Sequence, residues 1–308
     1  MFRSAIELAL PDVDGLDVEA IDSFLNMDAE NGGSAAAAWP LLITSALPQL
    51  RGYSLAQMIA LMVACAQQNR DGSVELRQCI EFFAGEAELS KAHVELGVGC
   101  VTRWDKDYGP HHDCLTGIGL AHWLRDLLLA CPGALVWLGI QCSSFVLICK
   151  GVAKREAANE WLGNTNHKFV QEGNVQMQIA SLIFLVATLI GCCPVIEQPI
   201  SSVLPKLKPL ATVLAFTKSM RTVTWMGAFQ GNSPKPLQLL HTAKEYKALA
   251  RKSPASMFPK DVLVTNLGTD KTGRRKFRGG KALKESQAYT AEFGRFVAVI
   301  TKGLVCKK

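Results

Sequence analysis

The sequence predicts an α/β protein built on a doubly wound, mostly parallel β-sheet, and three observations lead to this prediction. From residue 76 onward, short apolar runs alternate with segments that have helical spacing. The run 134–140 (ALVWLGI) is continuously apolar, as expected of a central strand covered on both faces. The 308 residues are 49% apolar and only 19% charged, a composition that suits a large core and excludes a disordered chain.

Residues 1–75 are predicted to form a helical extension that packs on the main domain at 76–303. The extension has an acidic start, a small-residue stretch at 31–38 (NGGSAAAA) and an apolar helical segment at 54–68 (SLAQMIALMVACAQQ). The glycines and alanines of the small-residue stretch are typical of a linker.

The elements of the main domain follow from their periodicity and their stop signals. Strands are expected at 78–83, 98–104, 134–140 and 194–199, and helices at 88–97, 115–131 and 174–191. The first helix ends at Gly97, and the second is expected to stop at Pro132-Gly133. Right-handed crossovers between such strands produce a parallel sheet.

The last part of the chain departs from this alternation. The runs 221–226 (RTVTWM) and 237–241 (LQLLH) are separated by a turn rich in Gly, Asn, Ser and Pro, so we expect an antiparallel hairpin. A closing helix is expected at 289–305, and a basic insert at 244–285 precedes it.

The segment 177–196 (MQIASLIFLVATLIGCCPVI) has nearly the length of a membrane span and carries no charge. However, Gly191 and Pro194 interrupt it, and Glu197 follows directly. A buried helix that runs into a buried strand gives the same pattern, and no basic cluster flanks the segment. We therefore expect no membrane association.

Charge is distributed unevenly along the chain, although the net value is only +6. Residues 1–202 contain 12 Lys and Arg against 22 Asp and Glu, whereas residues 203–308 contain 21 against 5. The densest stretch, 271–281 (KTGRRKFRGGK), combines cations, glycines and one aromatic ring. It fits a surface for an anionic partner such as nucleic acid, but a solvated loop has the same composition.

The ten cysteines are scattered, without a repeated C-x-x-C pattern. Residues 1–20 are acidic rather than basic and then apolar, so we expect no signal peptide. Reduced thiols in an intracellular protein, nuclear or cytoplasmic, are the simplest interpretation. His111, His112 and Cys114 could offer metal ligands, but without a second cluster at zinc spacing we expect no metal.

Candidate site residues follow the predicted strands, because ligands of open α/β sheets bind beyond the carboxyl ends of the strands. The first strand leads into the turn 83–88 (FAGEAE), whose glycine lets backbone amides approach a ligand. Asp105 and Asp107 follow the second strand, and Asp113 lies on the same edge. A carboxylate there can accept hydrogen bonds from both hydroxyls of a ribose, although a surface acid in a loop is an equal alternative.

Two further residues follow buried strands. Cys142 comes directly after the central strand, where a nucleophile would be presented, although a buried structural thiol is the alternative. Glu197 closes the next apolar run, and desolvation there would favour its protonated form and suit it to proton donation.

The order of these pieces over residues 76–303 resembles the DNA (cytosine-5) methyltransferase family. Residues 82–89 (FFAGEAEL) resemble its F-x-G-x-G cofactor loop, and Gln141-Cys142-Ser143 falls where the family has Pro-Pro-Cys-Gln. Glu197-Gln198-Pro199 falls at the family's Glu-Asn motif. Residues 227–241 and 286–294 resemble its hairpin and its closing helix.

The resemblance implies a Rossmann-like methyltransferase sheet and a role for each matching residue. Phe83, Gly85 and Glu86 would line S-adenosylmethionine, Asp105 would hold its ribose and Asp113 would contact its adenine. Cys142 would attack carbon 6 of a flipped cytosine, and Glu197 would hydrogen-bond the ring nitrogen. The residues assigned to nucleic-acid binding are Ser143, Lys235, Arg274, Arg275, Lys276, Phe277 and Arg278.

This chain also departs from the family pattern, and three hypotheses stay open. Ile140-Gln141 replaces the Pro-Pro pair, Ala87 replaces a glycine, and the hairpin has Lys235 in place of paired arginines. The first hypothesis is an active methyltransferase on DNA or RNA that uses Cys142, with DNA as the partner that the resemblance implies and RNA as a second candidate. The second is a catalytically silent module that binds nucleic acid or protein, and the third is a methyltransferase on another substrate without a covalent cysteine intermediate.

Overall fold

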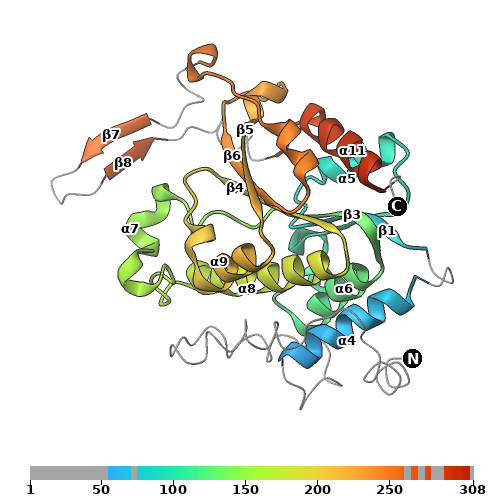
Figure 1. The fold of residues 1–308 in the computed structure, drawn as a ribbon. Helices are drawn as coiled ribbons and strands as arrows, with labels where there is room; N and C mark the ends of the chain where they lie inside the picture. Colours follow the sequence, from blue (N-terminus) through green and yellow to red (C-terminus); the bar gives the residue numbers. More distant parts are fainter. Residues whose placement is uncertain (1–54, 71–74, 260–264, 270–274, 279–287, 306–308) are drawn as a thin grey trace.

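The computed structural model describes residues 55–70, 75–259, 265–269, 275–278 and 288–305. Its centre is a six-stranded mixed sheet in the order β2-β1-β3-β4-β6-β5 (Figure 1). The strands are β1 (Arg77–Phe82), β2 (Val101–Trp104), β3 (Ala130–Leu138), β4 (Cys193–Pro199), β5 (Met220–Trp225) and β6 (Pro236–His241). The first four run parallel, whereas β6 is antiparallel to both β4 and β5. The predicted α/β class and the antiparallel pair near the C-terminus are therefore confirmed.

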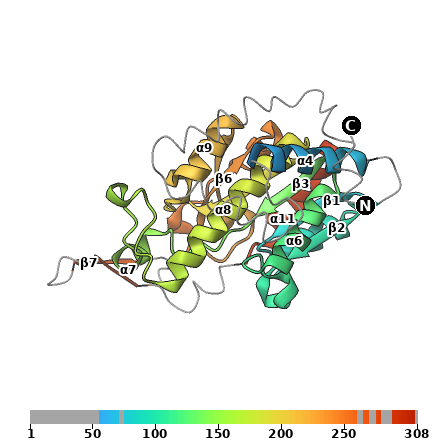
Figure 2. The same ribbon diagram turned by 90° about the horizontal axis from the view of Figure 1, so that it is seen from below.

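Helices cover both faces of the sheet. They are α4 (Leu55–Gln68), α5 (Glu88–Glu95), α6 (Gly117–Leu128), α7 (Lys150–Ala153), α8 (Lys168–Leu189), α9 (Lys208–Phe216) and α11 (Ala291–Val305). Figures 1 and 2 show α6, α8 and α9 against one face with α4 outside them, while α5 and α11 cover the other face. The sheet is thus enclosed between two helical layers.

Strand β3 divides the core between these two layers. Val136 and Leu138 belong to the apolar cluster under α6 and α8, whereas Leu135 and Trp137 belong to the cluster under α5 and α11. Alternation of this kind follows from the period of two in a strand, and all four side chains are fully buried. The continuous apolar run in the sequence therefore reflects burial on both faces.

The long apolar segment 177–196 forms the second half of α8, a turn at Gly191 and the start of β4. Its helical part is buried between the sheet and α4, α6 and α9. The expectation of a buried helix that runs into a buried strand is confirmed. None of the helices in the described part of the chain is both long and apolar enough to span a bilayer.

Helix α4 is the described part of the N-terminal region, and it coincides with the apolar segment predicted at 54–68. Its buried residues Met58, Ile59, Met62 and Val63 join the core cluster of α6 and α8. Packing on α6 and α8 explains why this segment has an apolar composition.

The Pro132-Gly133 pair does not stop a helix, contrary to the prediction. Helix α6 ends at Leu128, and the pair lies inside β3, where the register against β1 shifts between Arg77 and Cys79. Gly133 has φ 82° and donates a backbone hydrogen bond to Gly191 at 2.8 Å. A local irregularity in a strand tolerates Pro and Gly, so the same residues that end helices also mark bulges.

The basic insert contains a second, two-stranded antiparallel sheet, which the sequence did not predict. It consists of β7 (Thr265–Thr269) and β8 (Arg275–Arg278), with Asn266 paired to Phe277. Figure 1 shows this pair projecting from the body of the molecule on the side where α7 lies.

We expect Gly133→Ala to lower the free energy of unfolding by about 1–3 kcal/mol, because its φ is positive and a new Cβ would lie 2.9 Å from the carbonyl oxygen of Leu304. Gly151→Ala is the matched control, since it lies in α7 with open space around it and should be neutral or slightly stabilising. Urea unfolding of both variants checks this. Equal stability of the two would contradict the close packing of α11 on β3.

Candidate functional site

Loops from three neighbouring parallel strands meet at the carboxyl edge of the sheet, and hydrogen bonds join them. The backbone amide of Gly139 donates to the carbonyl of Phe82 at 3.1 Å, which connects the ends of β3 and β1. The side chain of Gln198 donates from Nε2 to the carbonyl of Ile140 at 2.6 Å, which connects β4 to the loop after β3. The loop that carries Cys142 is therefore held from both sides.

The loop after β1 has a backbone that ordinary residues rarely adopt. Phe83, Gly85 and Ala87 all have positive φ, at 58°, 52° and 55°. Two of these residues carry a Cβ, so the loop stores conformational strain of the kind that clusters at ligand-binding turns. Ala87, which stands where the resembled family has glycine, adopts the left-handed conformation as the residue preceding α5.

Asp105 holds this loop in place. Its Oδ2 accepts a hydrogen bond from the backbone amide of Gly85 at 2.9 Å, and its Oδ1 accepts one from the amide of Asp107 at 3.0 Å. The hydroxyl of Tyr108 donates to the carbonyl of Gly85 at 2.5 Å. Each carboxylate oxygen has two acceptor positions, so Asp105 retains capacity for a ligand after these bonds.

The other three predicted cofactor residues lie near the same edge but differ in surroundings. Phe83 is half-buried and meets Trp123 edge to face at 4.9 Å, whereas Glu86 is exposed. Asp113 precedes α6, and its Oδ1 accepts from the amide of Leu115 at 3.0 Å.

Glu197 is the last acceptor in a chain of buried hydrogen bonds. Only 7% of it is exposed, and Tyr289 donates to its Oε2 at 2.9 Å. The indole of Trp137 in turn donates to the Tyr289 hydroxyl at 3.1 Å. Burial raises the pKa of Glu197, while the charge of Lys235 and the Tyr289 hydrogen bond act in the opposite direction. The carboxyl group is thus oriented and has an increased affinity for its proton.

Cys142 is half-buried and lies close to this carboxyl group. Burial, together with the charge of Glu197, raises the pKa of its thiol to about 11, while the charge of Lys235 acts in the opposite direction. Cys142, Glu197 and Lys235 therefore lie close enough for their charges to interact, at the edge where the sequence predicted the first two. A thiol with this pKa is almost entirely protonated at neutral pH.

The remaining predicted nucleic-acid residues are spread over two places. Ser143 is half-buried beside Cys142, and the Lys235 Nζ lies 5.7 Å from the centre of the Tyr289 ring. Four of the predicted residues form β8, namely Arg275, Lys276, Phe277 and Arg278, whereas Arg274 lies outside the described residues.

Sequence reasoning missed several residues that the fold brings to this edge. Tyr289 and Trp137 hold Glu197, and Arg155 lies beneath the Cys142 loop. A tyrosine just before a predicted helix and a tryptophan inside an apolar strand give no signal of such contacts. Arg155 stands among other charged residues and looks like a surface cation in the sequence.

Glu81, a fully buried carboxyl group within β1, is a further residue that was missed. The backbone amide and the hydroxyl of Ser90 both donate to its Oε2, at 2.8 and 2.6 Å. Burial raises the pKa of Glu81 to about 7, although these hydrogen bonds oppose the shift. A charged residue inside an apolar strand pattern was the available signal.

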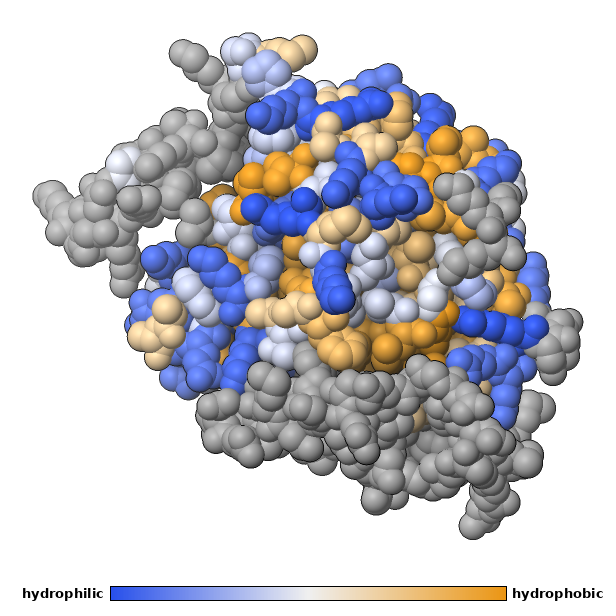
Figure 3. Space-filling view, in the orientation of Figure 1, coloured by the Kyte–Doolittle hydropathy of each residue, from blue (hydrophilic) through white to orange (hydrophobic). Residues whose placement is uncertain are grey.

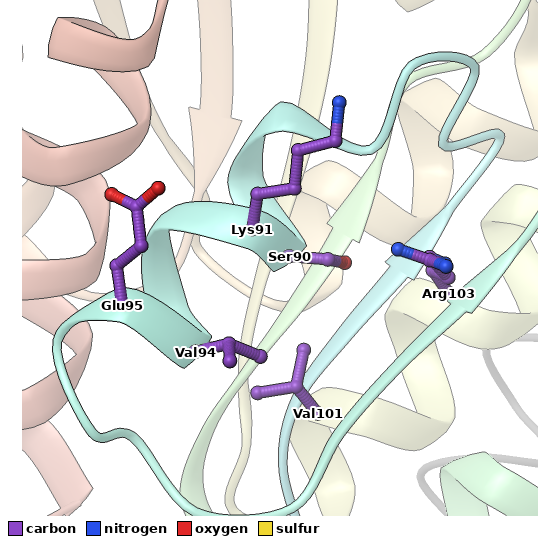
Figure 4. Close-up of a pocket in the computed structure, with 6 residues that line it drawn as sticks. All are labelled: Ser90, Lys91, Val94, Glu95, Val101 and Arg103. Carbon is purple, nitrogen blue, oxygen red and sulfur yellow. The ribbon is translucent and has the colours of Figure 1, made fainter.

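An open groove of about 510 Å³ lies elsewhere, between α5 and the edge strand β2 (Figure 4). Figure 4 shows Val94 of the helix opposite Val101 of the strand, with Arg103 further along that strand. Lys91, which also lines it, is paired with Glu88 at 2.6 Å. Ser90 connects the groove wall to Glu81, but none of the predicted site residues lines the groove.

No protein-family model matches this chain, and no curated protein or solved structure matches it significantly. Within the described ranges, no group of three or more His, Cys, Asp or Glu side chains is arranged to hold a metal ion. The site must therefore be interpreted from its own geometry.

We expect Glu81→Gln to change how stability depends on pH. Because the folded-state pKa is raised from 4.5 to about 7, the stability that protonated Glu81 contributes is fully present below pH 4.5 and is lost as pH rises through 7. The variant lacks this titration, so relative to the wild type it should gain about 3 kcal/mol between pH 4.5 and pH 8.

Urea unfolding at a series of pH values measures this difference. Glu86→Gln, at an exposed position in the neighbouring loop, serves as the control and should follow the wild type at every pH. Parallel stability curves for wild type and Glu81→Gln would show that Glu81 does not titrate with a raised pKa.

Proposed function

We propose that this chain is an S-adenosylmethionine-dependent methyltransferase that acts on nucleic acid, at carbon 5 of cytosine in DNA through Cys142. One observation carries the proposal: Cys142 and the hydrogen-bonded Glu197 lie together at the sheet edge that also presents the strained loop after β1. A thiol nucleophile, a proton-holding carboxyl group and a loop for a nucleotide-like cofactor are the parts that this chemistry requires. The mixed sheet with a single antiparallel strand, β6, is compatible with a Rossmann-like methyltransferase fold.

The residues beside this loop fit S-adenosylmethionine in chemical character. Asp105 keeps acceptor capacity for the ribose hydroxyls, and Phe83 offers a half-buried ring for the adenine. Gly85 and Glu86 are exposed and can line the ligand, while Asp113 can accept from an amino group. When bound, the cofactor supplies an electrophilic methyl group.

The proposed reaction assigns separate tasks to the two catalytic residues. The sulfur of Cys142 bonds to carbon 6 of the cytosine, which makes carbon 5 nucleophilic. Glu197 holds its proton toward the ring nitrogen and stabilises the ring as electron density shifts onto it, a task suited to its raised pKa. After methyl transfer to carbon 5, loss of the carbon 5 proton to a base and cleavage of the sulfur–carbon bond would release Cys142 as the thiolate, and the ring nitrogen would return its proton to Glu197.

Nucleic-acid binding is supported by charge. Lys235 adds a cation beside Glu197, and β8 carries three cations and an aromatic residue on an arm that projects from the body. Cations that neutralise phosphates and rings that stack on bases are the usual means of binding exposed strands. Both DNA and RNA fit this chemistry, and DNA is the proposed substrate.

A catalytically silent binding module is the second candidate, and the Cys142 thiol favours it. Reactive cysteines have a lowered pKa, whereas burial raises that of Cys142 to about 11. Substrate binding would have to bring a group that assists deprotonation. A methyltransferase that does not use Cys142 as a nucleophile avoids this requirement and is the third candidate.

The first test concerns the cofactor. Isothermal titration should show S-adenosylmethionine binding to the full chain, and Asp105→Ala should weaken it at least about tenfold because both the ribose acceptor and the anchor of Gly85 are lost. Asp107→Ala is the matched control, since only its backbone amide contacts Asp105. No binding by folded wild-type protein at millimolar cofactor would reject the cofactor proposal and leave the silent module.

The second test concerns the nucleophile. Cys142→Ser should abolish transfer of labelled methyl groups to DNA while cofactor affinity stays nearly unchanged, and Cys149→Ser, a nearby half-buried thiol, should stay active. DNA containing 5-fluorocytosine should trap a covalent adduct with wild-type protein and should not trap one with Cys142→Ser. Full activity of Cys142→Ser would instead support methyl transfer without a covalent intermediate.

A further inference from the structure

Arg155 is a buried cation within an exposed, polar segment. The surface around α7 is mostly hydrophilic (Figure 3), and the charged residues Lys150, Lys154, Glu156 and Glu160 are all exposed. Arg155 alone among the charged residues of this stretch is buried, with 3% of its surface exposed. A solvated loop would leave the side chain of Arg155 exposed, so specific contacts must account for its burial.

The guanidinium of Arg155 contacts the loop that carries Cys142. Its Nε donates to the carbonyl of Ser144 at 2.8 Å, and its Nη2 donates to the hydroxyl of the same residue at 3.0 Å. Its plane also lies over the ring of Phe145, at 4.2 Å from the ring centre. Three contacts thus fix two consecutive residues just beyond the thiol.

The other edge of the guanidinium is anchored in the scaffold. Nη1 donates to the carbonyl of Trp161 at 2.7 Å, to that of Leu162 at 3.1 Å and to Oδ1 of Asn174 in α8 at 2.8 Å. Among the described residues, no Asp or Glu lies within ion-pair distance of Arg155, and burial lowers its pKa to about 10. A buried charge held only by neutral groups is costly, so the hydrogen bonds that compensate Arg155 must all be kept in place.

A short turn connects Cys142 to the residues that Arg155 contacts. The amide of Phe145 donates to the carbonyl of Cys142 at 2.9 Å, and the carbonyl of Phe145 accepts from Val203 at 2.9 Å. Helix α8 packs tightly behind the turn, since a Cβ on Gly173 would come within 2.4 Å of the Ser144 hydroxyl. The conformation of the turn is therefore restricted as long as Arg155 keeps its contacts with Ser144 and Phe145.

We propose that Arg155 is the positioning residue of the site: it clamps Ser144 and Phe145 against α8 and thereby holds the Cys142 thiol at the sheet edge beside Glu197. The forked, planar guanidinium is required because one group must meet Ser144, the Phe145 ring and the α8 side at the same time. This inference rests on the proposed function in taking Cys142 as the nucleophile, but its test does not require methyl transfer.

Alkylation of Cys142 by iodoacetamide, followed by site-resolved mass spectrometry across pH 7–11, tests the clamp on the full chain. In the wild type, the reaction should be slow below a pH of about 11, because only the thiolate reacts. Arg155→Met should release the turn and expose the thiol, so that its pKa falls and alkylation at pH 9 becomes about tenfold faster. If methyl transfer is detected, its kcat should fall while cofactor affinity is unchanged.

Two further variants make the test decisive. Arg77→Met, at the opposite end of β1, breaks a pair with Asp126 and should destabilise the protein without altering the Cys142 profile. Ser144→Ala removes one bond to Arg155 and should accelerate alkylation about twofold to threefold, which keeps the test valid should Arg155→Met fail to fold.

A wild-type alkylation profile in folded Arg155→Met, or in Ser144→Ala if the former does not fold, would overturn the proposal. An equal acceleration in Arg77→Met would do the same, since general loosening would then explain the effect. Absence of methyl transfer by the wild type would defeat the proposed function alone, because the alkylation profiles would still decide the role of Arg155.

Discussion

The hydrogen bond from Tyr289 to Glu197 is the interaction on which the site depends, and it joins residues that are 92 positions apart in the chain. A carboxyl group buried to this degree needs a hydrogen-bond partner, and Tyr289 provides one while Trp137 orients the tyrosine. The donor can reach β4 only when α11 is docked, which is achieved by burying Phe293 and Val297 against the sheet. Packing of the last helix is therefore a condition for this hydrogen-bonded arrangement at the sheet edge to form.

The direction of β6 determines which cation reaches this edge. Because β6 runs antiparallel to β4, it begins where β4 ends, and Leu237 pairs with Pro199. Lys235 lies immediately before β6 and so arrives next to Glu197, where its charge lowers the pKa of the carboxyl group. A parallel strand would have placed that lysine at the opposite edge of the sheet.

Burial has the largest effect on the pKa values of the ionisable groups near this edge. Burial raises the pKa of Glu81, Cys142 and Glu197, which shifts each of these groups toward its neutral form. Arg155 remains charged because its hydrogen-bond donors meet carbonyl, hydroxyl and amide oxygens. The edge thus combines carboxyl and thiol groups whose pKa values are raised with a buried cation that forms hydrogen bonds to the neighbouring loop.

The sequence by itself determined the strand and helix alternation, the antiparallel pair and the positions of Cys142 and Glu197 after buried strands, because periodicity and strand ends are local properties. Pro132-Gly133 was misjudged because the same residues end helices and mark irregular strands. Only the tertiary structure decided that Tyr289 meets Glu197 and that Arg155 lies under the Cys142 loop. Such contacts join segments far apart in the chain, and they form only when packing brings the helices against the sheet.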